Sequence, residues 1–322
     1  MKKSNFIFRV CASIALLCSL VSCTQKAEPT ASIFPLEGVE PAVYYTAPTP
    51  LADGFDGELA IIMLQGWHGG VQVLPEYLAL QKSISEAYVI SPMYPRTEMT
   101  EAYNIEPDGR AIWNESWNPQ DLSKPGTPND DWRGGGDANG TELSSFDIID
   151  LLFAKLSDKA LFPNLKRIAL VGFSAGGQFV GRYVAVGKGE VREGIELIYA
   201  AMAPSTFLTL DEEDTWHYGL NNRPRYSRDL TPEQILNNLR TRRCLHGCGA
   251  LDTLSESLDQ TPCAMKQGEN RYIRFQNFQN TVNADPEWSK SVVFYTFENI
   301  GHKASKAYAD PFFANYIREG LK

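Results

Sequence analysis

Histidine, positive charge and long apolar runs are all scarce in this sequence of 322 residues. The four histidines are His68, His217, His246 and His302, so a mechanism that needs an imidazole has four candidates. Lys and Arg number 30 against 39 Asp and Glu, and a net charge of −9 has the wrong sign for a surface that binds phosphate backbones. Nucleic acid is therefore not expected as a partner.

The longest apolar run lies at the N-terminus, and no later stretch reaches the roughly 18 apolar residues of a membrane-spanning helix. Three basic residues precede this run at 10–21, an order typical of a secretory signal. The run ends in Leu20-Val21-Ser22-Cys23, which resembles the lipobox of bacterial lipoproteins. That resemblance implies removal of residues 1–22 as a signal peptide and lipidation of Cys23. Thr24, where an inner-membrane protein would usually have Asp, implies the outer membrane of the bacterial cell envelope.

The lipid, rather than basic residues, would then attach the protein to the membrane. Loss of residues 1–22 leaves 27 basic against 39 acidic residues, a net charge of −12. Residues 23–50 are rich in Pro, Thr, Ala and Ser, and we interpret them as the lipidated cysteine followed by a flexible tether. Residues 51–322 are expected to form a single domain with a sizeable core.

Three cysteines lie beyond the proposed lipidation site: Cys244, Cys248 and Cys263. Outside the cytoplasm they permit one disulfide and one unpaired thiol. In an extended strand Cys244 and Cys248 would be about 13 Å apart, too far to bond each other. We therefore expect Cys263 to pair with Cys248 or with Cys244. A metal cluster of these two strand cysteines with His246 would lack a nearby fourth ligand, so neither a metal nor another cofactor is expected.

Short apolar runs alternate with helical segments along the rest of the chain. Strands are predicted at 58–65, 87–93, 167–171, 195–201, 242–248 and 291–297, and helices at 74–86, 144–156, 175–186, 232–240 and from 305. This alternation predicts an α/β fold with a mostly parallel central sheet and helices on both faces.

Two long irregular stretches, 95–141 and 204–231, follow strand ends, where such sheets bind their ligands. The first contains Trp113, Trp117 and Trp132. These tryptophans would either form a substrate wall, suited to an aromatic or sugar-linked group, or attach the loop to the body of the domain.

A Gly-x-Ser-x-Gly motif, Gly172-Phe173-Ser174-Ala175-Gly176, lies between an apolar strand and a helix. Such a turn projects the serine hydroxyl above the sheet, and the glycines let the backbone pass where a side chain would clash. The helix N-terminus that follows favours developing negative charge. Ser174 is therefore the predicted nucleophile.

A serine nucleophile needs a base that takes its proton and an acid that holds the base in one tautomer. Where the serine lies on a strand–turn–helix motif of this kind, the order along the chain is nucleophile, acid, histidine. Only His302 lies beyond the last predicted strand, so it is the predicted base. Asp252, just past a strand end, is the predicted acid. Glu298 is the alternative, but it lies only four residues from His302, so the chain would have to double back.

The oxyanion that forms on a substrate carbonyl needs preorganised N–H donors. The backbone N–H of Ala175, directly after the nucleophile, should supply one. The glycine-rich turn at 65–70 should supply the other, and we assign it to the N–H of Trp67. His68, in the same turn, would either touch substrate or face solvent.

These motifs resemble the α/β-hydrolase superfamily from about residue 58 to the C-terminus, and more narrowly a group of secreted bacterial and fungal α/β-hydrolases. The narrower resemblance is carried by Trp132-Arg133-Gly134-Gly135-Gly136-Asp137-Ala138, Phe162-Pro163-Asn164-Leu165-Lys166, Ser174-Ala175-Gly176-Gly177-Gln178-Phe179-Val180, Arg182-Tyr183, Trp216-His217-Tyr218-Gly219-Leu220, Ala264-Met265-Lys266-Gln267-Gly268 and Asn270-Arg271. The resemblance implies an α/β-hydrolase fold with long loops over the active site, in which Ser174, Asp252 and His302 are nucleophile, acid and base. Gln65-Gly66 departs from the His-Gly of many relatives.

Two functions from different classes follow. The first is a lipid-anchored serine esterase that forms an acyl-enzyme and acts on a small-molecule or glycan-linked ester, with an amide or a thioester as alternative bonds. The second is a catalytically silent surface binding protein with an α/β-hydrolase fold, whose long loops form a recognition face. The complete order of serine, aspartate and histidine favours the enzyme.

Overall fold

The computed structural model of the chain describes residues 31–67, 69–71, 73–113 and 131–320. The predicted signal peptide and Cys23 lie outside the described residues, as do His68 and Trp117. No described helix is both long enough and apolar enough to span a bilayer.

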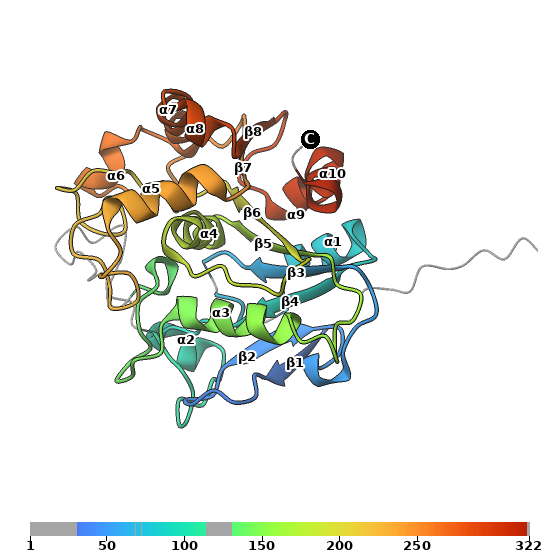
Figure 1. The fold of residues 1–322 in the computed structure, drawn as a ribbon. Coiled ribbons are helices and arrows are strands. Elements are labelled where there is room, and N and C mark those ends of the chain that lie inside the picture. Colours follow the sequence, from blue (N-terminus) through green and yellow to red (C-terminus); the bar gives the residue numbers. More distant parts are fainter. Residues whose placement is uncertain (1–30, 68, 72, 114–130, 321–322) are drawn as a thin grey trace, which may run out of the picture.

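One sheet of eight strands forms the centre of the fold (Figure 1), with the order β1-β2-β4-β3-β5-β6-β7-β8. The strands are β1 (Ser32–Pro35), β2 (Tyr44–Ala47), β3 (Leu59–Leu64), β4 (Tyr88–Pro92), β5 (Arg167–Phe173), β6 (Glu196–Met202), β7 (Cys244–Gly249) and β8 (Val292–Phe297). Strands β3 to β8 pair in parallel, whereas β1 and β2 add antiparallel strands at one edge. The predicted mostly parallel sheet is confirmed.

Helices cover both faces of the sheet (Figure 1). They are α1 (Pro75–Ser83), α2 (Thr97–Ala102), α3 (Ser145–Leu156), α4 (Ala175–Val186), α5 (Pro232–Thr241), α6 (Pro262–Lys266), α7 (Arg271–Asn283), α8 (Pro286–Ser289), α9 (Ala304–Tyr308) and α10 (Pro311–Glu319). Strand β3 is buried along its whole length. Ile62 and Leu64 pack in the core under α3 and α4, and Ile61 and Met63 pack in the core under α1, α9 and α10. Burial on both faces explains why this strand is continuously apolar.

The tether predicted over residues 23–50 is wrong for its second half. Strands β1 and β2 pair with each other, and β2 also pairs with β4, so this segment belongs to the sheet. Val43 and Tyr45 are buried in the same core as α3. The prediction failed because each strand has only four residues, and β4, which joins β2 to the rest of the sheet, lies far along the sequence.

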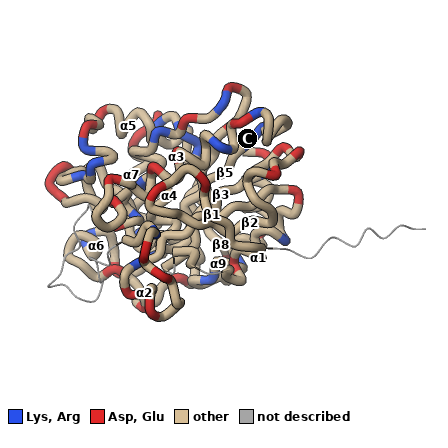
Figure 2. The backbone as a smooth tube through the Cα atoms, turned by 90° about the horizontal axis from the view of Figure 1, so that it is seen from below, with Lys and Arg blue, Asp and Glu red and all other residues tan. Residues whose placement is uncertain are grey.

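Charged residues of both signs are interspersed along the described chain (Figure 2). Several pair across elements, as Arg167 of β5 does with Glu196 of β6 and Arg240 of α5 does with Asp285. These exposed or half-exposed pairs each contribute little stability.

Candidate active site

Ser174 lies in the sharp turn between β5 and α4. Its backbone has φ 58° and ψ −117°, a strained conformation for a residue with a side chain. The N–H of Ser174 donates to the carbonyl of Met202 at 2.9 Å, and its own carbonyl accepts the first helical hydrogen bond from Gln178 at 2.9 Å. A Cβ at Gly172 would lie 2.2 Å from the carbonyl oxygen of Gly176, so this turn cannot form with a side chain there.

The structure brings Ser174, His302 and Asp252 into one hydrogen-bonded row. Nε2 of His302 lies 2.9 Å from Oγ of Ser174, and Nδ1 lies 2.6 Å from Oδ2 of Asp252. The imidazole is 30% exposed at the mouth of the site, whereas the carboxylate is 1% exposed. In the tautomer that donates from Nδ1, the imidazole presents a free lone pair on Nε2 to the serine hydroxyl.

Adjacent strand ends position the acid and the histidine. Asp252 follows β7, where its N–H donates to the carbonyl of Gly249 at 3.0 Å. His302 follows β8, and the two loops are joined by the N–H of Leu251, which donates to the carbonyl of Ile300 at 3.0 Å. The carboxyl ends of parallel strands share one edge of a sheet, so β5, β7 and β8 bring the three side chains together. Glu298, the alternative acid, is exposed.

A buried arginine that the sequence did not single out as functional lies against the acid. Nη1 of Arg271 is 3.5 Å from Oδ1 of Asp252, and both side chains are 1% exposed. Arg271 is the first residue of α7, and the N–H of Tyr272 donates to the Asp252 carbonyl. Burial lowers the pKa of Arg271, and the Asp252 carboxylate opposes this shift.

The glycine-rich turn expected to hold the oxyanion donor lies beside the serine. A Cβ at Gly66 would lie 3.9 Å from the Cβ of Ser174, and the N–H of Gly69 closes the turn on the carbonyl of Gly66 at 3.0 Å. Trp67 lies inside this turn, and the guanidinium of Arg96 stacks 3.7 Å from the centre of its ring. Ala175 is the first residue of α4, where N–H groups have no partner within the helix. Both predicted donors therefore belong to backbone that flanks Ser174.

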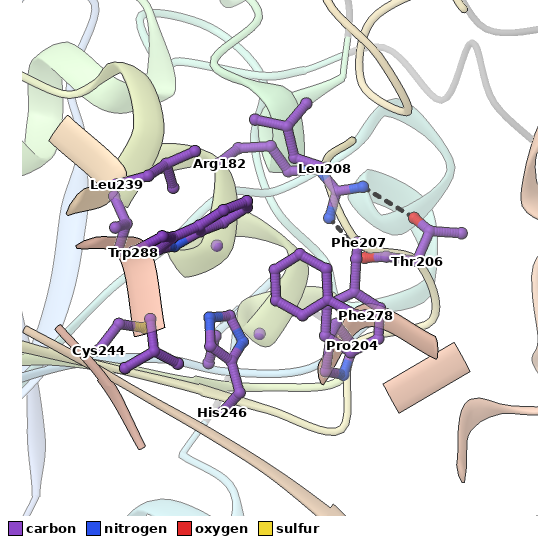
Figure 3. A pocket seen from close by; sticks show the side chains of 15 residues that line it. Arg182, Pro204, Thr206, Phe207, Leu208, Leu239, Cys244, His246, Phe278 and Trp288 are labelled. Carbon is purple, nitrogen blue, oxygen red and sulfur yellow. Dashed lines mark hydrogen bonds between the residues drawn. The ribbon is translucent and has the colours of Figure 1, made fainter. Parts of the chain in front are cut away.

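His246 lies on β7 and lines a small cavity of about 20 Å³ with Cys244, Phe278 and Trp288 (Figure 3). Its ring packs edge-on against Phe278 at 4.9 Å between centroids. Burial lowers its pKa to about 3, and its Nδ1 has no hydrogen-bond partner among the described residues. The side chain is therefore a neutral member of the core.

The irregular stretches 95–141 and 204–231 are here called the first and the second insertion. His217 is buried in the second insertion, where its Nδ1 lies 2.8 Å from Oδ2 of Asp131 in the first insertion. Burial lowers the pKa of His217, and Asp131 opposes this shift. The His217 carbonyl also accepts two hydrogen bonds from the buried guanidinium of Arg182 on α4. This histidine joins both insertions to the helix that follows the nucleophile.

Tryptophans attach the insertions to the body rather than line a substrate wall. Trp113 and Trp132 are buried, and both pack against Tyr94. Nε1 of Trp216 donates to the carbonyl of Gly134 at 2.8 Å, which joins the second insertion to the first. The substrate-wall interpretation is therefore wrong for Trp113 and Trp132.

The predicted disulfide is also wrong, because Cys244, Cys248 and Cys263 are free thiols. Cys244 and Cys248 are buried on β7, whereas Cys263 lies on α6 with its Sγ 3.6 Å from Oδ1 of Asp214 on the second insertion. The cysteine spacing could not reveal that α6 packs against this insertion. Within the described parts of the chain, no group of three or more His, Cys, Asp or Glu side chains is placed to hold a metal ion.

No family model matches the chain, and neither does any curated protein. Solved structures do match it. One is LpqC, a poly(3-hydroxybutyrate) depolymerase from Bordetella parapertussis, with a TM-score of 0.64, 15% identity and 91% of each chain covered. Another is poly(aspartic acid) hydrolase-1 from Sphingomonas sp. KT-1, with a TM-score of 0.60, 18% identity and 91% of this chain and 100% of that chain covered. The similarity shows the fold, so the predicted α/β-hydrolase fold is confirmed.

Proposed function

We propose that this chain is a serine hydrolase that cleaves carboxylic esters through an acyl-enzyme on Ser174. The observation that carries the proposal is the continuous contact from Oγ of Ser174 to Nε2 of His302 and from Nδ1 of His302 to Asp252. The strained backbone at Ser174 supports it, because strain of this kind persists where the surrounding structure holds a functional group in place.

Each residue of the row then has one role. His302 takes the proton from Ser174 as the hydroxyl oxygen attacks the ester carbonyl, and Asp252 stabilises the imidazolium that forms. The backbone N–H groups of Trp67 and Ala175 bind the oxyanion of the tetrahedral intermediate. His302 then returns its proton to the leaving alcohol, and a water molecule releases the acyl group from Ser174 by the same route.

An apolar acyl or alcohol group is the substrate chemistry that suits the rim of this site. Leu251 and Leu254 lie in the loop that carries Asp252, and they are 58% and 67% exposed. The two solved neighbours are a poly(3-hydroxybutyrate) depolymerase and a poly(aspartic acid) hydrolase, named for a polyester and a polyamide, and the same triad can cleave both bonds. We assign the ester because it is the more reactive bond. The glycan-linked alternative depended on exposed tryptophans, and Trp113 and Trp132 are buried.

An active-site fluorophosphonate probe tests the proposal without knowledge of the substrate. Wild type should become covalently labelled, and Ser174→Ala should not. Ser205→Ala serves as a matched control, because that buried serine lies outside the row and should leave labelling intact. A folded wild type that is not labelled would contradict the enzyme and favour the binding protein. A series of p-nitrophenyl esters of increasing acyl length then measures the preference for apolar groups.

We further propose that the mature protein begins at Cys23 and is anchored by lipid to the bacterial outer membrane. The support is the sequence Leu20-Val21-Ser22-Cys23 after an apolar run. Metabolic labelling with a radioactive fatty acid and fractionation of the cells test this: wild type should incorporate the label and fractionate with the outer membrane, and Cys23→Ala should not incorporate the label. Absence of label in wild type, or equal label in Cys23→Ala, would contradict the proposal.

A further inference from the structure

A buried guanidinium lies against the acid of the proposed triad. Asp252 uses Oδ2 to contact His302, and its other oxygen, Oδ1, lies 3.5 Å from Nη1 of Arg271. We propose that Arg271 is a positioning residue that keeps Asp252 ionised and directs Oδ2 toward His302. This inference rests on the proposed function and concerns the same site.

The surroundings of Asp252 make a neighbouring cation important. A carboxylate that is 1% exposed would favour its neutral form unless a cation or hydrogen bonds stabilise the charge. The titratable groups that face Asp252 are Arg271 on α7, His302 beyond β8 and Cys248 on β7. Burial raises the pKa of the Cys248 thiol, so this thiol is neutral and supplies no charge. His302 must itself be neutral before it takes the serine proton, which among the described residues leaves Arg271 as the cation beside Asp252 in the resting site.

The geometry also holds Arg271 in one orientation. Its Nη2 donates to the carbonyl of Ser257, and longer contacts reach the carbonyl of Glu256 at 3.4 and 3.5 Å. The N–H of Tyr272 donates to the carbonyl of Asp252 at 3.2 Å, so the first turn of α7 holds the whole acid loop. A planar guanidinium can make these contacts together, because its donors diverge in a rigid fork.

Arg271 could act in one of two ways, as a positioning residue or as a structural residue, and an experiment can distinguish them. As a positioning residue it acts through its charge on Asp252, whereas as a purely structural residue it would only join the loop to α7. The rate at which the fluorophosphonate labels Ser174, measured against pH, separates these roles. Labelling depends on the protons held by Asp252 and His302, and a neighbouring cation favours the forms that hold fewer protons. The acid limb of the profile therefore reports the charge of Arg271.

Arg271→Gln should therefore move the midpoint of the acid limb of this pH profile upward by about 1 pH unit. Its amide keeps a donor on a shorter stem, two bonds short of the Nη2 atom that donates to the Ser257 carbonyl. Arg271→Lys retains the charge and should keep the midpoint near that of wild type, even where the labelling rate falls.

Arg274→Gln is the matched control on the same helix. Arg274 is also buried, and it donates to the carbonyls of Ser205, Asp259 and Gly268. This variant should be less stable but should keep the wild-type midpoint. An unmoved midpoint in Arg271→Gln, or an equal shift in Arg274→Gln, would overturn the proposal.

If Arg271→Gln does not fold, the double variant Asp252→Asn with Arg271→Gln decides between the two roles. If the single variant unfolds because it leaves a buried carboxylate without its cation, removal of that charge should restore folding. A double variant that also fails to fold would assign Arg271 to the loop alone and overturn the proposal. Failure of the proposed function is recognised separately, because wild type itself would then remain unlabelled.

Discussion

Replacement of Asp252 by Asn is expected to lower kcat by about 10⁴-fold while the fold is retained. The side chain is 1% exposed and accepts from Nδ1 of His302 at 2.6 Å, and Asn fills the same volume. The charge that stabilises the imidazolium is lost, however. At about 4 Å and an effective dielectric constant near 20, that interaction is worth about 4 kcal/mol, or roughly a thousandfold in rate. The rest of the loss in kcat is expected because the amide of Asn can also donate to Nδ1 and hold the imidazole in the wrong tautomer.

The assay is steady-state hydrolysis of p-nitrophenyl acetate, together with the rate of fluorophosphonate labelling. Glu298→Gln is the matched control, because this exposed residue follows β8 in the loop that carries His302. It should retain activity within about twofold, as expected of a surface charge screened by solvent. If Glu298→Gln abolishes turnover and Asp252→Asn does not, the acid has been assigned to the wrong residue.

Two further predictions concern the core and the turn. The folded-state pKa of His246 is about 3, against 6.5 for an unperturbed histidine. The unfolded chain therefore binds the extra proton between these values, and the stability contributed by neutral His246 is lost as pH falls from 6.5 toward 3. His246→Phe should reduce the loss of unfolding free energy between pH 7 and pH 5 by about 2 kcal/mol, as measured in urea, and an unchanged pH dependence would refute this. Gly172→Ala should prevent accumulation of folded protein, because its Cβ would lie 2.2 Å from the Gly176 carbonyl oxygen, whereas Gly181→Ala in α4 meets open space and should be tolerated.

The six parallel strands were predictable because each is a short, mostly apolar run. Five of them are largely buried, and β8, at the edge of the sheet, is half-buried. Strands β1 and β2 were not, because a four-residue strand has almost no periodicity and depends on its partners. Helix α7 was missed for a different reason. Its buried side has two arginines, Arg271 and Arg274, alongside Phe275 and Phe278. Charged residues therefore occupy positions at which an amphipathic helix would have apolar residues.

The positions of Ser174, Asp252 and His302 were accessible from the sequence because each follows a strand, and the carboxyl ends of parallel strands meet at one edge. The absence of a disulfide among Cys244, Cys248 and Cys263 was not accessible from the sequence, because it depends on where α6 packs relative to β7. Cys263 contacts Asp214 on the second insertion, and no local pattern encodes that contact.

The need for long-range contacts also explains why the sequence indicated no functional role for Arg271, although it did identify Asp252. Catalysis by a serine requires a nucleophile, a base and an acid, so a sequence can be searched for these residue types at strand ends. A residue that tunes the acid need only reach it in space, and Arg271 does so from α7, 19 positions further along the chain. Buried arginines on a helix interrupt the amphipathic pattern from which the helix would be predicted. Burial also strengthens the electrostatic effect of these arginines on a nearby charge. The residues that set the electrostatics of such a site are therefore hardest to predict where their helices look least amphipathic.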